Sequence, residues 1–369
     1  MKSILISLIL IVLLTACGNN NNEKPSSDFK KLNLKQIAVF ADNEDWMLSR
    51  INQVQLDSQK NIFFTDMNQR QIYVLSYEGE LIHRIGSEGS GPGEFQGLGT
   101  ILLIHDKRFL ATDFTNRRVS DFNFTDGEWS YSGSLNVDNN ASFFVGQLFQ
   151  LHSGELLVNN PLVIGREGMP EMDKVTSRNN AFAKITPEGE MLIESFMETK
   201  GISMYMSQSE GRFNVAMIPF MELELMTVSP TGYIYVANNM KTKVTKRNAD
   251  FEEVAVFEFE ANRYPVTNQE LDNALVNHEG SFRNTIRGLI PEIKPVINRI
   301  LVSDSGDVWV NVYGKEHNRG WIVMNEDGGI KGKVEFPNQT TVHQIRGNKI
   351  YTVQLDEYDI PTIVIFELS

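Results

Sequence analysis

Five segments of the chain repeat the same order of short strands and turns, and this repeat limits what the chain can fold into. Each unit is a strand, a tight turn, a strand, a loop, a strand, a Gly-containing turn and a strand. The strand-like runs are rich in β-branched and aromatic residues and are bounded by Gly, Asn or Asp. Residues 57–86 and 105–133 carry the order most clearly, and it returns in units that begin near His152, Ser229 and Ser303.

A sixth, partial copy lies at the C-terminal end, "RGNKIYTVQLDEYDIPTIVIFEL", and it lacks a fourth strand. A spare strand-like run, "LNLKQIAVF" (32–40), precedes the first unit. We therefore predict an all-β domain over residues 32–369, a six-bladed β-propeller in which the N-terminal strand closes the last blade. A long β-sandwich or solenoid fits poorly, because the sixth unit would then end on a bare strand edge.

Two motifs resemble a known family. "TDFTNRRVSDFN" (112–123) matches the NHL-repeat pattern D-x-x-N-x-R-[IV] with Asp113, Asn116, Arg118 and Val119. "GSEGSGPGEF" (86–95) is similar to the glycine-rich linker that joins NHL repeats. The resemblance is strong over residues 51–135 and weak beyond them, and it implies an NHL-like propeller.

The same glycine-rich stretch invites a second interpretation, as a loop that binds phosphate. A Walker loop needs Gly-Lys-Ser/Thr at the start of a helix, and a dinucleotide fingerprint needs a βαβ unit. Here Glu94 and Phe95 end the stretch, and another strand follows. We therefore expect the glycines to serve the architecture, by allowing the positive φ angles needed where the chain passes between blades.

The N-terminus carries a leader. Lys2 precedes eleven apolar residues, Ile4 to Leu14, which are too few to span a bilayer as a helix. "LTAC" then resembles the lipobox of a bacterial lipoprotein signal. The resemblance implies a signal peptide over 1–16, acylation with palmitate-type chains at Cys17, and a polar tether over 17–31. The alternative is an ordinary secretory signal, although Cys17 is the only cysteine of the chain.

The leader indicates where the protein is located in the cell, and the net charge excludes one class of partner. Gly18 follows the cysteine, which by resemblance favours the outer membrane of a Gram-negative bacterium, with the protein facing the periplasm or the cell surface. The formal net charge is −13 without a basic cluster, so nucleic acid is excluded as a partner. We expect a monomer held at the envelope by its lipid anchor.

Long insertions fall on one side of the predicted ring, at 159–181, 197–222 and 261–295. In a propeller, the loops between second and third strands share a face with the linkers between blades. The opposite face receives only tight turns of Asp, Asn and Gly. The last insertion, between blades four and five, is predicted to be helical, with Thr267 and Glu270 as a capping box. Such loops usually carry binding function, although the alternative is that they plug the channel and add core.

Arginine and aromatic residues are frequent in these insertions and in the loop before residue 321, and such residues commonly anchor interfaces. The predicted ligand-binding residues are Arg166, Arg178, Tyr205, Arg212, Phe213, Arg283, Arg287, His317, Arg319 and Trp321. The second insertion also holds several methionines, which are typical either of an adaptable surface or of core filling, and we favour core filling.

Catalytic chemistry is weakly indicated. No two histidines have metal-ligand spacing, and no nucleophile and base can be named. We therefore favour a non-catalytic binding or scaffold lipoprotein, without a cofactor, that holds a protein, peptide or glycan. The alternative is a calcium-dependent hydrolase or lactonase with a site at the channel mouth. The metal-ligand candidates for that alternative are Glu222, Glu224 and Asn298.

Overall fold

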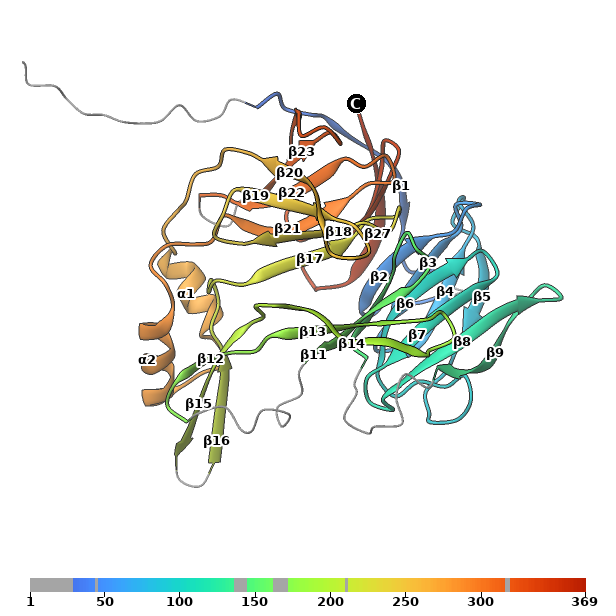
Figure 1. Ribbon diagram of the computed structural model, residues 1–369, viewed down its shortest axis with the longest axis horizontal. Helices are drawn as coiled ribbons and strands as arrows, with labels where there is room; N and C mark the ends of the chain where they lie inside the picture. Colours follow the sequence, from blue (N-terminus) through green and yellow to red (C-terminus); the bar gives the residue numbers. More distant parts are fainter. Residues whose placement is uncertain (1–28, 44–45, 136–144, 162–171, 210–211, 316–318) are drawn as a thin grey trace, which may run out of the picture.

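A computed structural model describes residues 29–43, 46–135, 145–161, 172–209, 212–315 and 319–369 of the chain. These residues form six four-stranded sheets, one three-stranded sheet and two short helices (Figure 1). Each four-stranded sheet is one blade, and the fold is a six-bladed β-propeller. Neither described helix is long and apolar enough to cross a membrane. The predicted signal peptide and Cys17 lie outside the described residues.

The first five blades use consecutive parts of the chain. Blade one contains β2 (Ile51–Leu56), β3 (Ile62–Asp66), β4 (Gln71–Leu75) and β5 (Leu81–Ile85). Blade two contains β6 (Leu98–His105), β7 (Arg108–Asp113), β8 (Arg118–Thr125) and β9 (Glu128–Leu135). Blade three contains β10 (Gln147–Gln150), β11 (Leu156–Pro161), β13 (Asn180–Ile185) and β14 (Met191–Thr199). Blade four contains β17 (Glu224–Val228), β18 (Ile234–Asn238), β19 (Lys243–Arg247) and β20 (Glu253–Glu258). Blade five contains β21 (Ile297–Val302), β22 (Val308–Tyr313), β23 (Arg319–Met324) and β24 (Ile330–Val334).

Blade six joins the two ends of the chain. It contains β25 (Thr340–Arg346), β26 (Lys349–Leu355) and β27 (Pro361–Leu368), and its outer strand is β1 (Leu34–Phe40). Strands β1 and β27 are antiparallel, with Leu34 opposite Leu368 and Phe40 opposite Ile363. The predicted closure by the N-terminal strand is confirmed.

The residues just before β1 are also paired. The backbone N–H of Lys333 in β24 donates to the carbonyl of Lys30 over 2.8 Å, and that of Leu32 donates to the carbonyl of Lys333 over 2.9 Å. The last residues of the expected tether are therefore held against blade five. The N-terminal segment as a whole links blade five to blade six.

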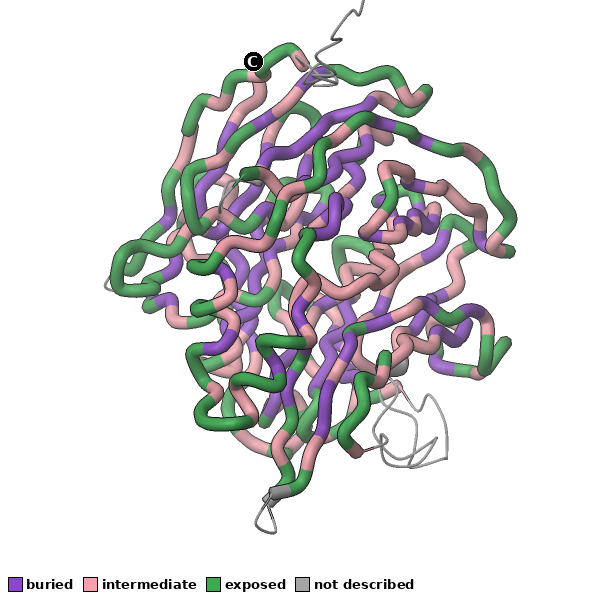
Figure 2. The backbone as a smooth tube through the Cα atoms, turned by 90° about the vertical axis from the view of Figure 1, so that its left-hand side faces the viewer, coloured by how far each residue is buried: buried purple, intermediate pink, exposed green. Residues whose placement is uncertain are grey.

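The hydrophobic core lies between neighbouring blades. Six clusters of buried residues each join two of them, so that together they run round the whole ring. Phe63 and Phe109, for example, join blades one and two, and Trp309 and Ile350 join blades five and six. Middle strands pack on both faces, and β3 is buried at all five positions. Figure 2 shows these buried stretches inside the ring and the exposed stretches at its turns.

Buried aspartates at the ends of second strands explain the NHL-like motif. The carboxylate of Asp113 accepts hydrogen bonds from the backbone N–H groups of Gln96 and Gly97, at 3.1 and 2.9 Å, in the arriving linker. It also accepts from the N–H of Asn116, at 3.0 Å, in the turn that follows β7. Asp66 does the same in blade one. In blades one and two the motif thus fastens the arriving segment to the blade that it enters.

The glycine-rich stretch 86–95 is part of this architecture, as predicted. The guanidinium of Arg118 donates to the carbonyls of Ser90 and Gly91, at 3.0 and 2.8 Å. Phe95 is fully buried between the blades. Gly86 has a φ of +86°, and a Cβ there would lie 2.5 Å from the Phe95 ring, so only glycine fits. Two backbone carbonyls of this loop are thus bound to Arg118. The element that follows the loop is the strand β6, whereas a phosphate-binding loop would be followed by a helix.

The turns between first and second strands lock neighbouring blades together, and we call their side of the ring the turn face. These contacts pair Ser58 with Asp106, His152 with Gly232, Asp304 with Gly347, and Asp57 with Arg346. The opposite side, which carries the linkers and the insertions, is the loop face. The polar groups of the turn face are thus used for assembly of the ring.

The insertions come together in one layer, which we call the insertion layer. It contains the sheet of β12 (Val175–Ser177), β15 (Ser203–Ser209) and β16 (Arg212–Met217), and the helices α1 (Asn268–Ala274) and α2 (Gly280–Leu289). Figure 1 shows it beside the blades, at the lower left. Its own core includes Tyr205, Ala216, Leu275 and Ile286. The predicted helices between blades four and five are confirmed.

Candidate functional site

Helix α1 begins at the predicted capping box. The N–H of Glu270 donates to the Thr267 hydroxyl, and the Glu270 carboxylate accepts from the N–H of Thr267. The same carboxylate lies 2.8 Å from the ammonium of Lys294, which is fully buried. Burial opposes the ionisation of Glu270, but Lys294 and Thr267 together hold its pKa below the usual range. The pair fixes the helices to the linker that enters blade five.

The predicted binding residues Arg283 and Arg287 join the two helices. Asp272 Oδ1 lies 3.2 Å from a terminal guanidinium nitrogen of Arg283 and 3.4 Å from one of Arg287. Arg283 also donates to the carbonyl of Leu275. These side chains are only partly exposed, and their donors are engaged within the layer. Their evident role is to hold α2 against α1.

The second insertion forms the β15–β16 hairpin, in which apolar side chains alternate between two faces. On β16, Ala216 is buried against the helices. Phe213, Val215 and Met217 point to the other side and are 55%, 43% and 65% exposed. We call these three residues the apolar stripe. Strand β16 is also the outer strand of its sheet, and no other described strand pairs with its free edge.

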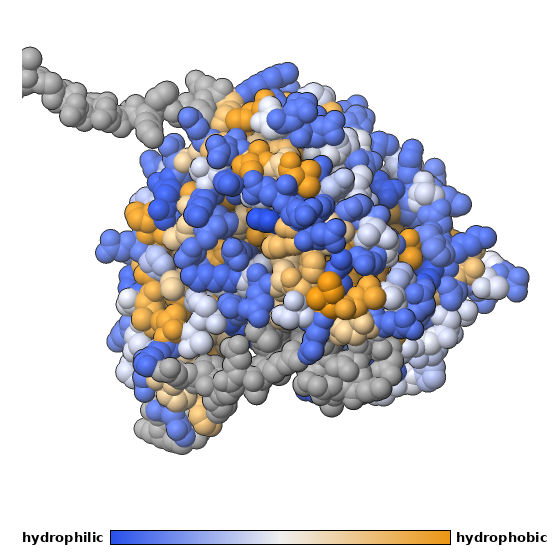
Figure 3. Space-filling model, viewed as in Figure 1, coloured by the Kyte–Doolittle hydropathy of each residue, from blue (hydrophilic) through white to orange (hydrophobic). Residues whose placement is uncertain are grey.

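The strand β15 completes the outer face of this sheet with two methionines. Met204 lies opposite Met217, and Met206 opposite Val215, and side chains directly across antiparallel strands share a face. Met206 is buried, as core filling predicts, whereas Met217 is the most exposed member of the stripe. Figure 3 shows apolar patches among polar surface on this part of the molecule. The outer face is thus apolar, and its exposed part lies on β16.

The other predicted residues do not gather at one point. Tyr205 is buried in the insertion layer, and its hydroxyl donates to Asp173 over 3.1 Å. Arg178 is half-buried beside β12. Trp321 is 6% exposed and packs edge-on against Trp309 between blades five and six, because β23 turns it inward. Its ring is therefore mostly covered by the two blades, and its part in ligand binding stays a prediction. Arg166 and His317 lie outside the described residues, as do the side chains of Arg212 and Arg319.

The candidate calcium ligands are already bonded. Glu222 lies 2.8 Å from the Lys200 ammonium and accepts from the Asn238 amide at 2.7 Å, and these bonds lower its pKa. Glu224 accepts from the backbone N–H of Lys200, and Asn298 donates to Asn311. Among the residues that the structure describes, no three His, Cys, Asp or Glu side chains come together as a metal site would require. The calcium alternative stays a prediction.

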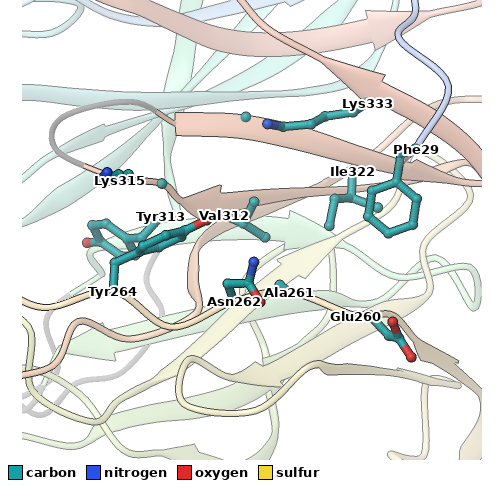
Figure 4. Close-up of a pocket in the computed structure, with 12 residues that line it drawn as sticks. Phe29, Glu260, Ala261, Asn262, Tyr264, Val312, Tyr313, Lys315, Ile322 and Lys333 are labelled. Carbon is teal, nitrogen blue, oxygen red and sulfur yellow. The ribbon is translucent and has the colours of Figure 1, made fainter. Parts of the chain in front are cut away.

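A cleft of about 300 Å³ opens between blades four and five, next to the insertion layer. Figure 4 shows Tyr264 and Tyr313 side by side at one end, close to Lys315, with Phe29 and Ile322 at the other end. The Tyr313 ring also packs edge-on against Phe220 of the second insertion. Aromatic faces beside an ammonium group can hold a planar ring or a sugar ring. No sequence signal marked this cleft, because its walls come from four separate segments.

Comparisons with known proteins agree with the six-bladed propeller fold. Residues 40–208, which are less than half of the chain, match the model of the family DUF5128, described as a 6-bladed beta-propeller. A search of curated proteins finds no match. The match extends the propeller assignment beyond the residues that carry the NHL-like motifs.

Solved structures resemble the whole ring at low sequence identity. An exported protein of Bacteroides fragilis is 14% identical, with 92% of this chain and 95% of that chain covered and a TM-score of 0.57. A member of the DUF4221 family from Bacteroides vulgatus is 11% identical, with 93% and 99% covered and a TM-score of 0.55. A virginiamycin B lyase of Staphylococcus aureus is 11% identical, with 92% and 100% covered and a TM-score of 0.47. At this identity the likeness concerns the fold alone.

Proposed function

We propose that this chain is a binding protein of the cell envelope that holds a polypeptide partner against the apolar stripe of β16. The observation that carries the proposal is the exposure of Phe213, Val215 and Met217 on one face of an outer strand. Contiguous exposed apolar side chains beside a free strand edge are typical of protein interaction sites.

The arrangement favours an extended segment as the partner. A free edge offers backbone N–H and C=O groups to an added strand, and the alternate side chains then supply selectivity. Phe213 and Met217 would contact such a strand on one face, and methionine adapts to different side chains. The helices α1 and α2 support the other face of the sheet, so the stripe is presented by a packed layer.

The envelope location rests on the leader, since the lipobox at Cys17 predicts a lipid anchor at the membrane surface. A rigid propeller behind a polar tether would present its loop face to proteins in the same compartment. The turn face is the weaker candidate, because its polar groups join neighbouring blades.

A site-specific crosslink tests this proposal. A photoreactive amino acid replaces Val215 in the full-length protein, and irradiation of intact cells should yield one discrete protein adduct. The matched control replaces Val254, which is 51% exposed on the outer strand of blade four and should yield none. Identical adducts from both positions would count against the stripe.

The captured protein is then purified and titrated against a triple variant, Phe213→Ser with Val215→Ser and Met217→Ser. We expect about 100-fold weaker binding, since a few buried apolar anchors carry most of the energy of an interface. The melting temperature should stay unchanged, because these side chains are exposed. Equal affinity of the variant and the natural protein would refute the proposal.

A further inference from the structure

A second cavity, of about 370 Å³, lies between blades five and six on the loop face. Its walls are the first residues of the inner strands β21 and β25 and the linker that joins the two blades. Asn298, Arg299, Asn311 and Thr341 contribute polar groups, and Trp321 and Phe336 contribute apolar surface. The cavity is separate from the apolar stripe and from the cleft of Figure 4, so a ligand bound in it would be independent of a polypeptide on β16.

Among the residues that the structure describes, Arg299 is the only charged one that lines this cavity. It follows an irregularity in the pairing of β21 with β22, between Ile297 and Arg299, and such bulges commonly redirect a side chain. The side chain is half-buried and forms no hydrogen bond or ion pair with any residue that the structure describes. An arginine keeps its charge in a protein, so the cavity carries one positive charge that is not neutralised.

Two other cations of the described chain, which are also shielded from solvent, are paired with carboxylates. Arg108 lies 2.9 Å from the carboxylate of Asp121, and Lys294 lies 2.8 Å from that of Glu270. Burying a cation without a partner is costly, and proteins usually avoid it. A guanidinium left without a partner in a cavity is therefore best explained by a partner that comes from solution.

The positive charge of Arg299 also affects the pKa of His343 on β25. Two effects lower the pKa of His343 to about 3. The larger is burial, and the smaller is the positive charge of Arg299. His343 is therefore neutral at physiological pH and adds no second positive charge. Burial also lowers the pKa of Arg299 from its ordinary value.

We propose that this cavity binds a small organic anion, with a carboxylate or phosphate group on Arg299 and an apolar body against Trp321 and Phe336. The guanidinium has five N–H donors in a fork that fits two oxygens of either group. The side chains of Asn338 and Thr341, which form no hydrogen bond with any described residue, line the same cavity and supply further donors. The volume lies within the range of small-molecule sites.

Calorimetric titration of the purified protein tests the proposal with benzoate and phenyl phosphate, which carry the two acid groups on one ring. Benzyl alcohol is the uncharged control, and inorganic phosphate lacks the apolar body. We expect saturable binding of at least one ring-bearing anion, with weaker binding of inorganic phosphate and none of benzyl alcohol. The preferred acid group then identifies the ligand class. Failure of both anions to bind at about 10 mM, a level that corresponds to a very weak site, would overturn the proposal.

Variants locate the site. Arg299→Gln should weaken binding about 10- to 100-fold, which is the usual effect of losing a charged hydrogen bond. Lys107→Gln removes the same charge from an exposed turn on the turn face and should change nothing. Thr341→Asp places a negative charge on an exposed residue of the cavity wall, and it should weaken binding even if Arg299→Gln does not fold. Undiminished binding by Thr341→Asp, or by a folded Arg299→Gln, would place the anion elsewhere.

Discussion

Glu270 and Lys294 form a buried ion pair, with 2.8 Å between Oε1 and Nζ, that ties the first helix of the insertion layer to the entry of blade five. Lys294 is fully buried and Glu270 is 8% exposed. Each group therefore receives from the other a charged hydrogen bond that replaces one lost with water.

Removal of one partner should destabilise the protein strongly. We expect Lys294→Met to lower the free energy of unfolding by about 3 to 5 kcal/mol, because the Glu270 carboxylate would stay buried and lose its charged hydrogen bond with Lys294. Urea unfolding followed by circular dichroism measures the change. The control is Lys333→Ala, which breaks the half-exposed pair with Glu335 and should cost less than about 1 kcal/mol. Similar losses from the two variants would show that burial does not govern this pair.

Ring closure by β1 leads to the second prediction. A chain that starts at Asp42 lacks β1, so the edge of β27 and part of the core around Phe40 become exposed. The lost apolar burial corresponds to several kcal/mol at about 25 cal/mol per Å². Thermal unfolding and light scattering should reveal a markedly lower melting temperature or aggregation, relative to a chain that starts at Phe29. A truncated monomer that melts at the same temperature would contradict the role of β1.

The blades could be predicted because their signals are local. Alternation within strands and turn residues at their ends recur in each unit, and the missing fourth strand of the last unit required a partner such as residues 32–40. The capping box at Thr267 is equally local, since it involves residues three apart.

The candidate sites depended on long-range packing and could not be predicted in the same way. Trp321 stands next to a loop in sequence, but the pairing of β23 with β22 turns its ring into the core. Arg299 lies in the strand "INRILV", and no local pattern reveals that none of the described carboxylates pairs with it. Arg283 and Arg287 have the residue type of an interface, yet Asp272 of the neighbouring helix binds both.

Lipid anchoring is the third prediction, and it rests on the lipobox "LTAC". Replacement of Cys17 by Ser removes the thiol that would carry the acyl chain. We expect the variant to lose metabolic labelling with a fatty acid and to accumulate as an unprocessed or soluble product. Fractionation of labelled cells measures both effects. A serine variant that is still labelled and still sediments with membranes would show that Cys17 is not the lipidation site.

The last prediction concerns the acid stability of the fold and depends on His343. Its pKa is about 3 in the folded protein, whereas an unperturbed histidine has a value of 6.5. Above pH 6.5 the imidazole is neutral in both states, and the stability is complete. As the pH falls from 6.5 towards 3, only the unfolded chain binds the proton, so the free energy of unfolding decreases by up to about 1.4 kcal/mol per pH unit.

A variant that cannot titrate isolates this effect. In His343→Gln, the stability measured by urea unfolding should fall less steeply between pH 6 and pH 4 than in the natural protein, because one proton fewer is taken up on unfolding. His105→Gln, at an exposed position on the turn face, should keep the natural slope. If His343→Gln and the natural protein lose stability in parallel over this range, then His343 is protonated in the folded state. In that case, neither burial nor the charge of Arg299 keeps the imidazole neutral.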